Sequence, residues 1–440
     1  MMRSTSNVFS TSGLALIAAA ALLLTACSRN PKPVATTEPP PPTITPVPFT
    51  QDPITREEPI LRVAVVTNAD NVELTCEGSF RLTGGTLGEA GKRFAKGTAI
   101  QASADGATLR LRSGNKTLTS GTDSFRLIPD EDDPVQVNRS RYRGGFEIRP
   151  GAVGGVTILN RIPMEEYLRG VVPNEISHGK PDLLEAVKAQ AVAARTYALI
   201  SRGQYEAAGY DLLATVADQV YSGVAVESPV VDQGLRETRG VVALYEGQPI
   251  VTNYASTCGG HTADRDEVWD KPPLPYLRGI ADKGSEGDWC QGSKYYRWEE
   301  TWPGEDFWRS ARPNLNKEYG YAITDESRLK AVHITETGPS GRVRKLKFET
   351  TTGSYEARGD RIRWILSRPA NAGPLRSILF ELDMRESNGR VTQLTAKGAG
   401  WGHGVGMCQW GAMTRSRKGQ DYRRILGDYY QGAQLAAIYP

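Results

Sequence analysis

The chain has 440 residues, of which 39% are hydrophobic and 23% are charged. This length and composition predict two or three globular domains with substantial cores. The formal net charge is only +3, so the chain lacks the basic surface that nucleic-acid binding requires, and we set nucleic acid aside as a partner.

The first residues have the layout of an export signal. Arg3 precedes an apolar run from Leu14 to Leu24, which is too short to span a bilayer as a stable helix. The tetrad Leu24-Thr25-Ala26-Cys27 that follows resembles the lipobox of bacterial lipoproteins, whose cysteine is lipidated after cleavage. We therefore expect a signal peptide over 1–26 and an exported cell-envelope lipoprotein anchored to a membrane through Cys27. The alternative is an ordinary secreted protein with a chance cysteine.

A proline-rich stretch separates this signal from the folded part. Ten prolines lie between residues 31 and 59, a composition that favours extended polyproline II and cannot build a core. The range 27–59 is therefore predicted to be a stiff tether.

The next range, 60–135, is predicted to be a small β-rich domain. A strand begins at Ile60, and Val72, Leu74 and Cys76 alternate onto one face of the next strand. Cys76 is expected to be a buried thiol. The acidic patch at 130–134 is interpreted as a linker.

A larger region over 143–440 opens with strands around 143–162 and then turns helical. Pro181, Asp182 and Glu185 mark a helix start, with the acidic residues near the positive end of its dipole. Apolar residues follow at helical spacing, which predicts a buried face: Leu184, Val187, Ala191, Ala194 and Ala198.

Three polar residues are embedded in this alanine-rich helix: Gln190, Arg195 and Tyr197. A buried guanidinium needs an anionic or carbonyl partner. For Arg195 the pattern leaves open a core ion pair or a role in a site.

Further along the chain, short strands and turns alternate over 216–254. A smaller inserted α+β subdomain is expected at about 330–395, with a hairpin at 338–341 and a helix near 361–367. An amphipathic helix around 422–430 closes the chain. The fold class is therefore α+β, with mixed strands and helices in the larger region and the β-rich domain in front of it.

One carboxyl stands where a general acid is often found. In Val171-Val172-Pro173-Asn174-Glu175-Ile176-Ser177-His178 an apolar strand runs into a proline, and Glu175 follows in the loop leading to the alanine-rich helix. Partial desolvation at such a junction raises the pKa of a carboxyl, so that it stays protonated near neutral pH.

Four residues have the chemistry of a structural zinc site. Cys258 and His261 stand three apart, and with Cys290 and Cys408 they form a Cys₃His set. A disulfide between two of the cysteines is the alternative that export favours. A third interpretation makes Cys258 or Cys408 a nucleophile with His261 or His403 as its base.

The segment from Gly398 to Gly406 has a glycine at every second position, with Trp401 and His403 between them. In an extended chain one face would be bare backbone; in a looped chain the glycines supply positive φ. In both cases the backbone can approach a ligand closely, and Trp401 offers a flat surface that packs on a sugar ring. The Gly-Lys-Ser/Thr ending of a phosphate loop is absent, and no βαβ unit surrounds the segment.

Several motifs together resemble the stage II sporulation protein D family, which includes the amidase enhancers. They occur in order over roughly 145–440: VVPNEI at 171–176, EAVKAQAVAARTYAL at 185–199, ADQVYSG at 217–223, RGVVALYEGQPIVTNYASTCGGHT at 239–262, PYLRGI at 275–280 and GWGHGVGMCQWGA at 400–412. The N-terminal strands fit the family only loosely.

The resemblance implies a lytic transglycosylase that cleaves peptidoglycan glycan strands between N-acetylmuramic acid and N-acetylglucosamine, with a preference for strands without stem peptides. It also implies that Glu175 is the catalytic acid and that 1,6-anhydro ends are formed. A hydrolase would need a second carboxylate about 5 to 9.5 Å away. Glu165, Glu166, Asp218 and Asp266 remain candidates for that role.

The family motifs also contain the residues that we expect to line a glycan cleft: Gln190, Arg195, Tyr197, Ser256, Trp401, His403 and Gln409. Some relatives carry a zinc held by cysteine and histidine, which favours zinc on Cys258, His261, Cys290 and Cys408. Replacing Gly404 with valine is expected to abolish activity while the fold survives.

Two other function classes remain. One is a non-catalytic activator of a peptidoglycan amidase that binds glycan, which would make an amidase the partner. The other is a cysteine-dependent peptidase.

Overall fold

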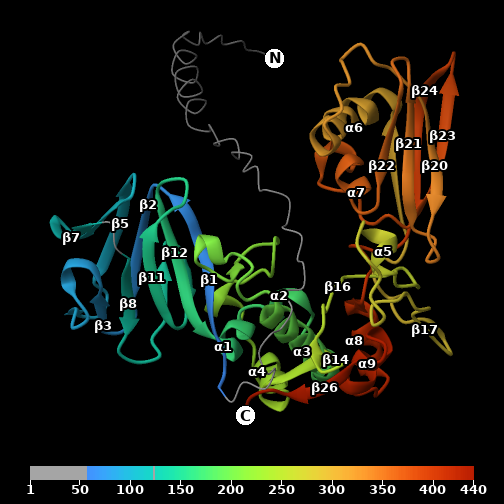
Figure 1. Cartoon of the computed structure of the whole chain (residues 1–440). Helices are drawn as coiled ribbons and strands as arrows, with labels where there is room; N and C mark the ends of the chain where they lie inside the picture. Colours follow the sequence, from blue (N-terminus) through green and yellow to red (C-terminus); the bar gives the residue numbers. More distant parts are fainter. Residues whose placement is uncertain (1–56, 122–123) are drawn as a thin grey trace, which may run out of the picture. The chain divides into compact units, whose positions relative to one another are not determined.

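The computed structural model describes residues 57–121 and 124–440 (Figure 1). Helices and several sheets occur together in it, which confirms the α+β class. The predicted signal peptide, Cys27 and nearly all of the tether lie outside the described residues. Within those residues, no helix combines the length and the apolar character needed to cross a membrane.

Two large sheets dominate the N-terminal part of the described residues. The first has the order β13-β1-β12-β11-β8-β3-β4, with β1 Ile60–Ala69, β3 Phe80–Thr83, β4 Lys92–Phe94, β8 Phe125–Pro129, β11 Gly145–Pro150, β12 Val156–Pro163 and β13 Leu212–Leu213. The second has the order β10-β9-β2-β5-β6-β7, with β2 Asn71–Cys76, β5 Ala99–Asp105, β6 Thr108–Ser113, β7 Lys116–Gly121, β9 Val135–Val137 and β10 Ser140–Tyr142.

The two sheets share one hydrophobic core. β6 contacts β11, and β5 contacts β12. The alternating residues Val72, Leu74 and Cys76 are buried in this core, as their spacing predicts. Burial raises the pKa of the Cys76 thiol, which keeps it an inert apolar side chain.

The acidic patch at 130–134 does not separate two domains. It connects β8 in one sheet to β9 in the other, and Asp130 accepts hydrogen bonds from Ser79 and Arg93. β11 pairs with β8, and β12 pairs with β1. The sheets therefore cross the boundary that we expected at residue 135, because strands on both sides of it are needed to complete the first sheet.

The centre of the next region is the helix α3 (Leu184–Ile200), which a short 3₁₀ turn at Pro181–Leu183 precedes. Its alanines are buried on most sides because other elements pack closely around it. Those elements are α1 (Met164–Arg169), α2 (Val172–Glu175), α4 (Pro229–Glu237), β14 (Val241–Tyr245), α8 (Gln409–Arg417) and α9 (Tyr422–Tyr429). β14 pairs with β15 (Gln248–Pro249) on one side and with β26 (Gln434–Ala437) on the other.

The inserted subdomain is larger than 330–395. β19 (Trp298–Pro303) pairs with β24 (Arg390–Gly398), which also pairs with β23 (Phe380–Ser387). A second sheet contains β20 (Leu329–Thr337), β21 (Val343–Thr350) and β22 (Ser354–Arg358), and the helices are α6 (Gly304–Tyr319) and α7 (Arg361–Ile365). The predicted hairpin at 338–341 joins β20 to β21. We did not predict α6 from the sequence, because Pro313 interrupts its helical pattern.

Short elements connect this subdomain to the α3 region. They are β16 (Tyr254–Ala255), α5 (Arg265–Val268), β17 (Lys283–Gly284), β18 (Gly287–Asp288) and β25 (Met407–Cys408). β16 and β25 pair in parallel, and this small pair carries much of the candidate site.

Candidate active site

Glu175 is the last residue of α2 and lies half-buried beside the start of α8. Its Oε2 atom accepts a hydrogen bond of 3.4 Å from Nε2 of Gln409. Burial raises the pKa of Glu175, and hydrogen bonds from Gln409 and Tyr254 act in the opposite direction. The carboxyl thus has the property expected of a general acid: it holds its proton at a higher pH than an exposed glutamate, while two donors stand ready for its anion.

Gln409 joins the acid to the buried helix. The same Nε2 atom donates to Oε1 of Gln190 on α3 at 3.3 Å, and Gln190 is fully buried. The Nε2 atom of Gln190 has no hydrogen-bond partner among the described residues. Three predicted site residues from distant parts of the sequence therefore meet at one place.

Three further residues, which the sequence did not single out, form a hydrogen-bonded chain that begins at the acid. Tyr254 approaches the carboxyl of Glu175, and its hydroxyl accepts a hydrogen bond of 3.1 Å from Gln219. Gln219 in turn accepts one of 3.3 Å from the hydroxyl of Tyr167. The first two lie in motifs that we quoted, but a tyrosine in a strand gives no sequence signal of the direction of its hydroxyl.

Tyr197 lies on α3 and donates from its hydroxyl to Oδ1 of Asp218 at 3.3 Å. Asp218 also accepts from the backbone of Leu213 at 2.8 Å. Burial raises the pKa values of both Tyr197 and Asp218. Asp218 directly precedes Gln219 in the sequence, so the Tyr197–Asp218 pair adds polar groups next to Gln219.

Arg195 lies in the core, away from the acid's hydrogen-bond network. It is fully buried and donates to both carboxylate oxygens of Glu165 on α1, at 2.8 and 2.7 Å. Glu165 also accepts from Tyr439 at 2.7 Å and from the backbone of Gly240 at 3.2 Å. Its geometry is that of a core ion pair, the alternative left open by the sequence, and its expected place in a glycan cleft is not what the structure shows.

The glycine-rich segment loops, which decides between its two interpretations. Gly400, Gly402, Gly404 and Gly406 all have positive φ, between 71° and 104°. The loop runs against residues 253–258, so that a Cβ on Gly406 would lie 2.1 Å from the carbonyl oxygen of Asn253. The glycines are needed for this close approach of two backbones, which the β16 and β25 pair continues.

Trp401 and His403, the two ring-bearing residues of this loop, are both half-buried. Trp401 packs on Tyr295 with 4.3 Å between ring centroids, and His403 packs on Trp269 with 4.9 Å. Burial lowers the pKa of His403 to about 4, and its Nδ1 accepts from the backbone of Val405. His403 is therefore neutral at neutral pH, with its proton on Nε2.

Ser256 follows β16 and is half-exposed. Its carbonyl oxygen accepts a hydrogen bond of 3.1 Å from the backbone of Trp410, and its hydroxyl lies 3.4 Å from that of Thr257. Ser256 thus helps to join β16 to the start of α8.

Three cysteines and one aspartate gather next to this strand pair. The ligand atoms of Cys258, Asp282, Cys290 and Cys408 all lie within 4.8 Å of one another, and all four residues are buried. The sulfurs of Cys258 and Cys290 are 3.6 Å apart, and the cysteines are free thiols. Burial raises the pKa values of Cys258 and Cys408, while hydrogen bonds from these two thiols lower the pKa of Cys290.

His261 is not part of this cluster. Its Nδ1 lies 2.6 Å from the carbonyl oxygen of Thr262, and Asp282 occupies the fourth position in its place. The expectation of His261 as a ligand was therefore wrong in geometry, because the glycines after Cys258 turn the chain away from the sulfurs. Neither His261 nor His403 forms a hydrogen bond to a thiol in the described part of the chain, so the nucleophile interpretation lacks its base.

Two buried arginines lie beside the cluster. Arg415 and the hydroxyl of Tyr429 both donate to Oδ1 of Asp282, at 3.2 and 2.8 Å. Arg342 donates to the carbonyl oxygen of Cys258 at 2.9 Å. Buried cations need compensating negative charge, so this environment favours an anionic set of ligands.

The four carboxylates considered as a second catalytic group all have other partners. Glu165 pairs with Arg195, Glu166 with Arg169 at 2.9 Å and Asp266 with Arg278 at 2.9 Å. Asp218 is held by Tyr197 and Leu213, as described above.

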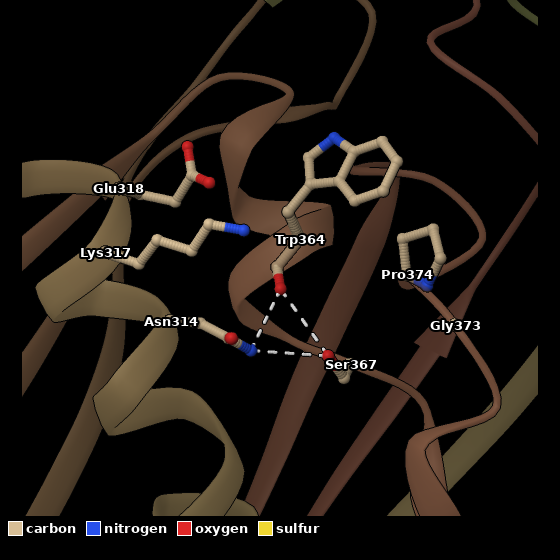
Figure 2. Close-up of a pocket in the computed structure, with 7 residues that line it drawn as sticks. All are labelled: Asn314, Lys317, Glu318, Trp364, Ser367, Gly373 and Pro374. Atoms are coloured by element: carbon tan, nitrogen blue, oxygen red, sulfur yellow. Dashed lines mark hydrogen bonds between the residues drawn. The ribbon is translucent and has the colours of Figure 1, made fainter. Parts of the chain in front are cut away.

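A separate pocket of about 240 Å³ lies in the inserted subdomain, between α6 and α7. Figure 2 shows the indole of Trp364 over this pocket, with Asn314 donating toward Trp364 and Ser367 at its base. None of the predicted site residues lines it.

In comparisons with known protein families, two regions of the chain match a family. A family described as stage II sporulation protein matches residues 152–245, and a domain of unknown function matches residues 285–406. The first covers the segment from β12 to β14 with Glu175. The second covers the whole inserted subdomain and the glycine-rich loop, which agrees with the larger limits of the insert in the structure.

Three relatives illustrate the similarity. An uncharacterized protein of Brachyspira hyodysenteriae is 30% identical over 328 residues, which cover 74% of this chain and 80% of that protein. The amidase enhancer of Bacillus subtilis is 30% identical over 304 residues, covering 61% of this chain but 40% of that protein. Stage II sporulation protein D of the same organism is 29% identical over 294 residues, covering 63% and 76%.

Proposed function

Because the chain belongs to the stage II sporulation protein D family, we propose that it cleaves the glycan strands of peptidoglycan as a lytic transglycosylase, with Glu175 as acid and then base. The observation that carries this proposal is the environment of Glu175. Its carboxyl is desolvated enough to raise its pKa, and Gln409 and Tyr254 hydrogen bond to it.

The proposed reaction needs one carboxyl. Protonated Glu175 gives its proton to the glycosidic oxygen as the bond to C1 of N-acetylmuramic acid breaks. The carboxylate that remains takes the proton of the C6 hydroxyl as that oxygen bonds to C1. The acid is thereby regenerated, and the products are a 1,6-anhydro end and a free 4-hydroxyl on N-acetylglucosamine.

One feature supports this outcome over hydrolysis, and a second supports Glu175 as the acid of either reaction. Hydrolysis requires a second carboxylate as base or nucleophile, and the four candidates are engaged elsewhere. Gln409 and Tyr254 donate to the carboxylate form of Glu175, which stabilises the anion formed in the first step.

The test is mass spectrometry of the products that wild type and Glu175→Gln release from stem-peptide-free strands. Anhydro ends from wild type alone are expected. Products with reducing ends would show that the protein is a hydrolase and not a transglycosylase. No release by either protein would favour the second candidate function, a non-catalytic activator of an amidase, which the similarity to an amidase enhancer supports. If the protein is such an activator, wild type and Glu175→Gln should stimulate a purified amidase equally well.

We also propose that Cys258, Cys290, Cys408 and Asp282 hold a structural zinc ion. A tetrahedral site with zinc-sulfur bonds of about 2.3 Å separates its sulfurs by about 3.8 Å, close to the 3.6 Å between Cys258 and Cys290. Three thiolates and one carboxylate leave a net negative charge around zinc, which Arg342 and Arg415 offset. Tyr429 and Arg415 would orient Asp282 through its other oxygen.

For the cell location, we retain the proposal of an exported lipoprotein anchored through Cys27, which would hold the enzyme at the membrane facing its substrate. It is based on the tetrad that ends at Cys27 and on the short apolar run before it.

A further inference from the structure

Positively charged side chains lie over the aromatic rings next to the glycine-rich loop. The guanidinium carbon of Arg368 is 5.3 Å from the ring centre of Trp401, and that of Arg376 is 5.7 Å from the rings of both Trp401 and Tyr295. The ammonium of Lys294 is 4.8 Å from the ring of Tyr295. We call these five residues the cationic aromatic cluster.

The charges of this cluster are only partly balanced. Arg376 pairs with Glu300. Arg368 donates to the backbone oxygens of Pro374 and Ala372. Neither Arg368 nor Lys294 forms an ion pair within residues 57–121 and 124–440. Two cations thus remain without a carboxylate partner beside half-exposed rings.

The cluster lies on the same backbone as the catalytic acid's partners. The backbone N–H of Gly402 donates to the carbonyl oxygen of Arg376 at 2.8 Å, and Trp401 and Thr257 exchange backbone hydrogen bonds of 2.8 and 3.1 Å. Thr257 is three residues from Tyr254, a separation of at most about 11 Å in a fully extended chain. The cluster is therefore connected through hydrogen-bonded backbone to Tyr254, which hydrogen bonds to Glu175.

An aromatic face together with a guanidinium suits a sugar that carries a carboxylate. The ring packs on the apolar face of the sugar, and arginine binds a carboxylate through two parallel hydrogen bonds. In peptidoglycan the lactyl group of N-acetylmuramic acid is such a carboxylate only when the stem peptide is absent, because the peptide converts it to an uncharged amide.

On this ground we propose that a neighbouring sugar of a strand bound at Glu175 reaches this cluster, and that Arg368, with Lys294 and Arg376, binds the lactyl carboxylate of that peptide-free N-acetylmuramic acid beside the rings of Trp401 and Tyr295. The inference rests on the proposed glycan substrate and adds to it: selection of peptide-free strands is assigned to the loop 366–376 of the inserted subdomain and to Lys294. The stem peptides' own carboxylates are the other source of the same chemistry.

The experiment measures binding in the Glu175→Gln background, so that strands are not cleaved. Three preparations of the same strands are compared: peptide-free strands with the free carboxylate, the same strands with the lactyl group converted to its methylamide, and strands that retain their stem peptides. Arg368→Gln and Lys294→Gln test the cluster. Arg309→Gln, an exposed arginine on α6, is the matched control.

We expect the free acid to bind about tenfold more tightly than the methylamide, the effect of one charge-assisted hydrogen bond. Arg368→Gln and Lys294→Gln should each bring this ratio toward one, and Arg309→Gln should leave it as it was. The exposed Lys294 keeps the test informative if Arg368→Gln folds poorly.

Equal binding of acid and methylamide would overturn the inference, and so would tighter binding of strands that keep their stem peptides. The proposed function is tested separately by the products of the wild type. If wild type forms anhydro products but binds the free acid and the methylamide equally well, only the proposed carboxylate subsite is refuted. A preference that responds to Arg368→Gln, in a protein that releases no products, would leave the subsite standing and remove the transglycosylase.

Discussion

Removal of the negative charge from Glu165 should destabilise the protein strongly. The Arg195 side chain is 0% exposed, and that of Glu165 is 10% exposed. In Glu165→Gln, Arg195 would retain only the carbonyl oxygen of Val241, at 3.0 Å, as an unchanged acceptor. Breaking a buried ion pair from one side costs about 3 to 5 kcal/mol.

The assay is thermal unfolding of four proteins. At about 2 °C per kcal/mol for a large domain, Glu165→Gln should lower the apparent Tm by about 6 to 10 °C. The double variant Glu165→Gln with Arg195→Met should recover part of this loss, because it no longer buries an unpaired charge. Glu166→Gln, whose side chain on the same helix is 39% exposed, should cost less than about 1 kcal/mol.

An unchanged Tm in Glu165→Gln would refute the structural role of this pair. The same conclusion would follow if Arg195→Met lost activity at a wild-type Tm, since Arg195 would then act on the substrate. On the geometry here, the activity of Arg195→Met should instead follow the fraction of folded protein.

Three further predictions concern Glu175, the cluster of Cys258, Asp282, Cys290 and Cys408, and the glycine-rich loop. The raised pKa of Glu175 means that wild type loses stability relative to Glu175→Gln as the pH rises from the ordinary carboxyl value through the raised one, because only wild type then buries a charge; parallel Tm profiles would contradict this. Protein purified without chelator should contain zinc, which Cys408→Ser should lose and His261→Ala should keep; a stoichiometric disulfide without zinc would end the metal proposal. Gly404→Val should fail to fold to the wild-type Tm, because its Cβ would lie 2.1 Å from the buried guanidinium of Arg342 at a φ of +79°; a folded, inactive Gly404→Val would restore the expectation from the sequence.

Local patterns in the sequence predicted local structure well. The apolar spacing from Leu184 to Ala198 corresponds to α3, and the glycines at 338–341 mark the β20 to β21 hairpin. Both signals depend on neighbours within a few residues, which any single sequence displays. Sheet partners are different: β11 pairs with β8 across the acidic patch, and no local pattern encodes a pairing at that separation.

The site shows the same limit at the level of side chains. The sequence identified Glu175, Gln190 and Gln409 through their motifs, and the structure brings them together. It could not show that Arg195 faces Glu165, because a buried ion pair and a substrate contact place the same residue types in a helix. Nor could the sequence show that Asp282, and not His261, lies with the three cysteines. The number of residues between two positions predicts the distance between them only when the chain between them is straight.

The order of residues just after the glycine-rich loop explains why the buried cysteine cluster and the proposed catalytic acid lie so close together. Cys408 and Gln409 are consecutive, and the strand pair that places Cys408 beside Ala255 also places Tyr254. Gln409 and Tyr254 are the two residues that hydrogen bond to Glu175. The four residues proposed as zinc ligands are at most 1% exposed, so a zinc ion held there would have no open position for substrate and would be structural. Its contribution to chemistry is therefore positional: it fixes β16 against β25, and the glycines allow the two backbones to come near enough for both donors to reach one carboxyl.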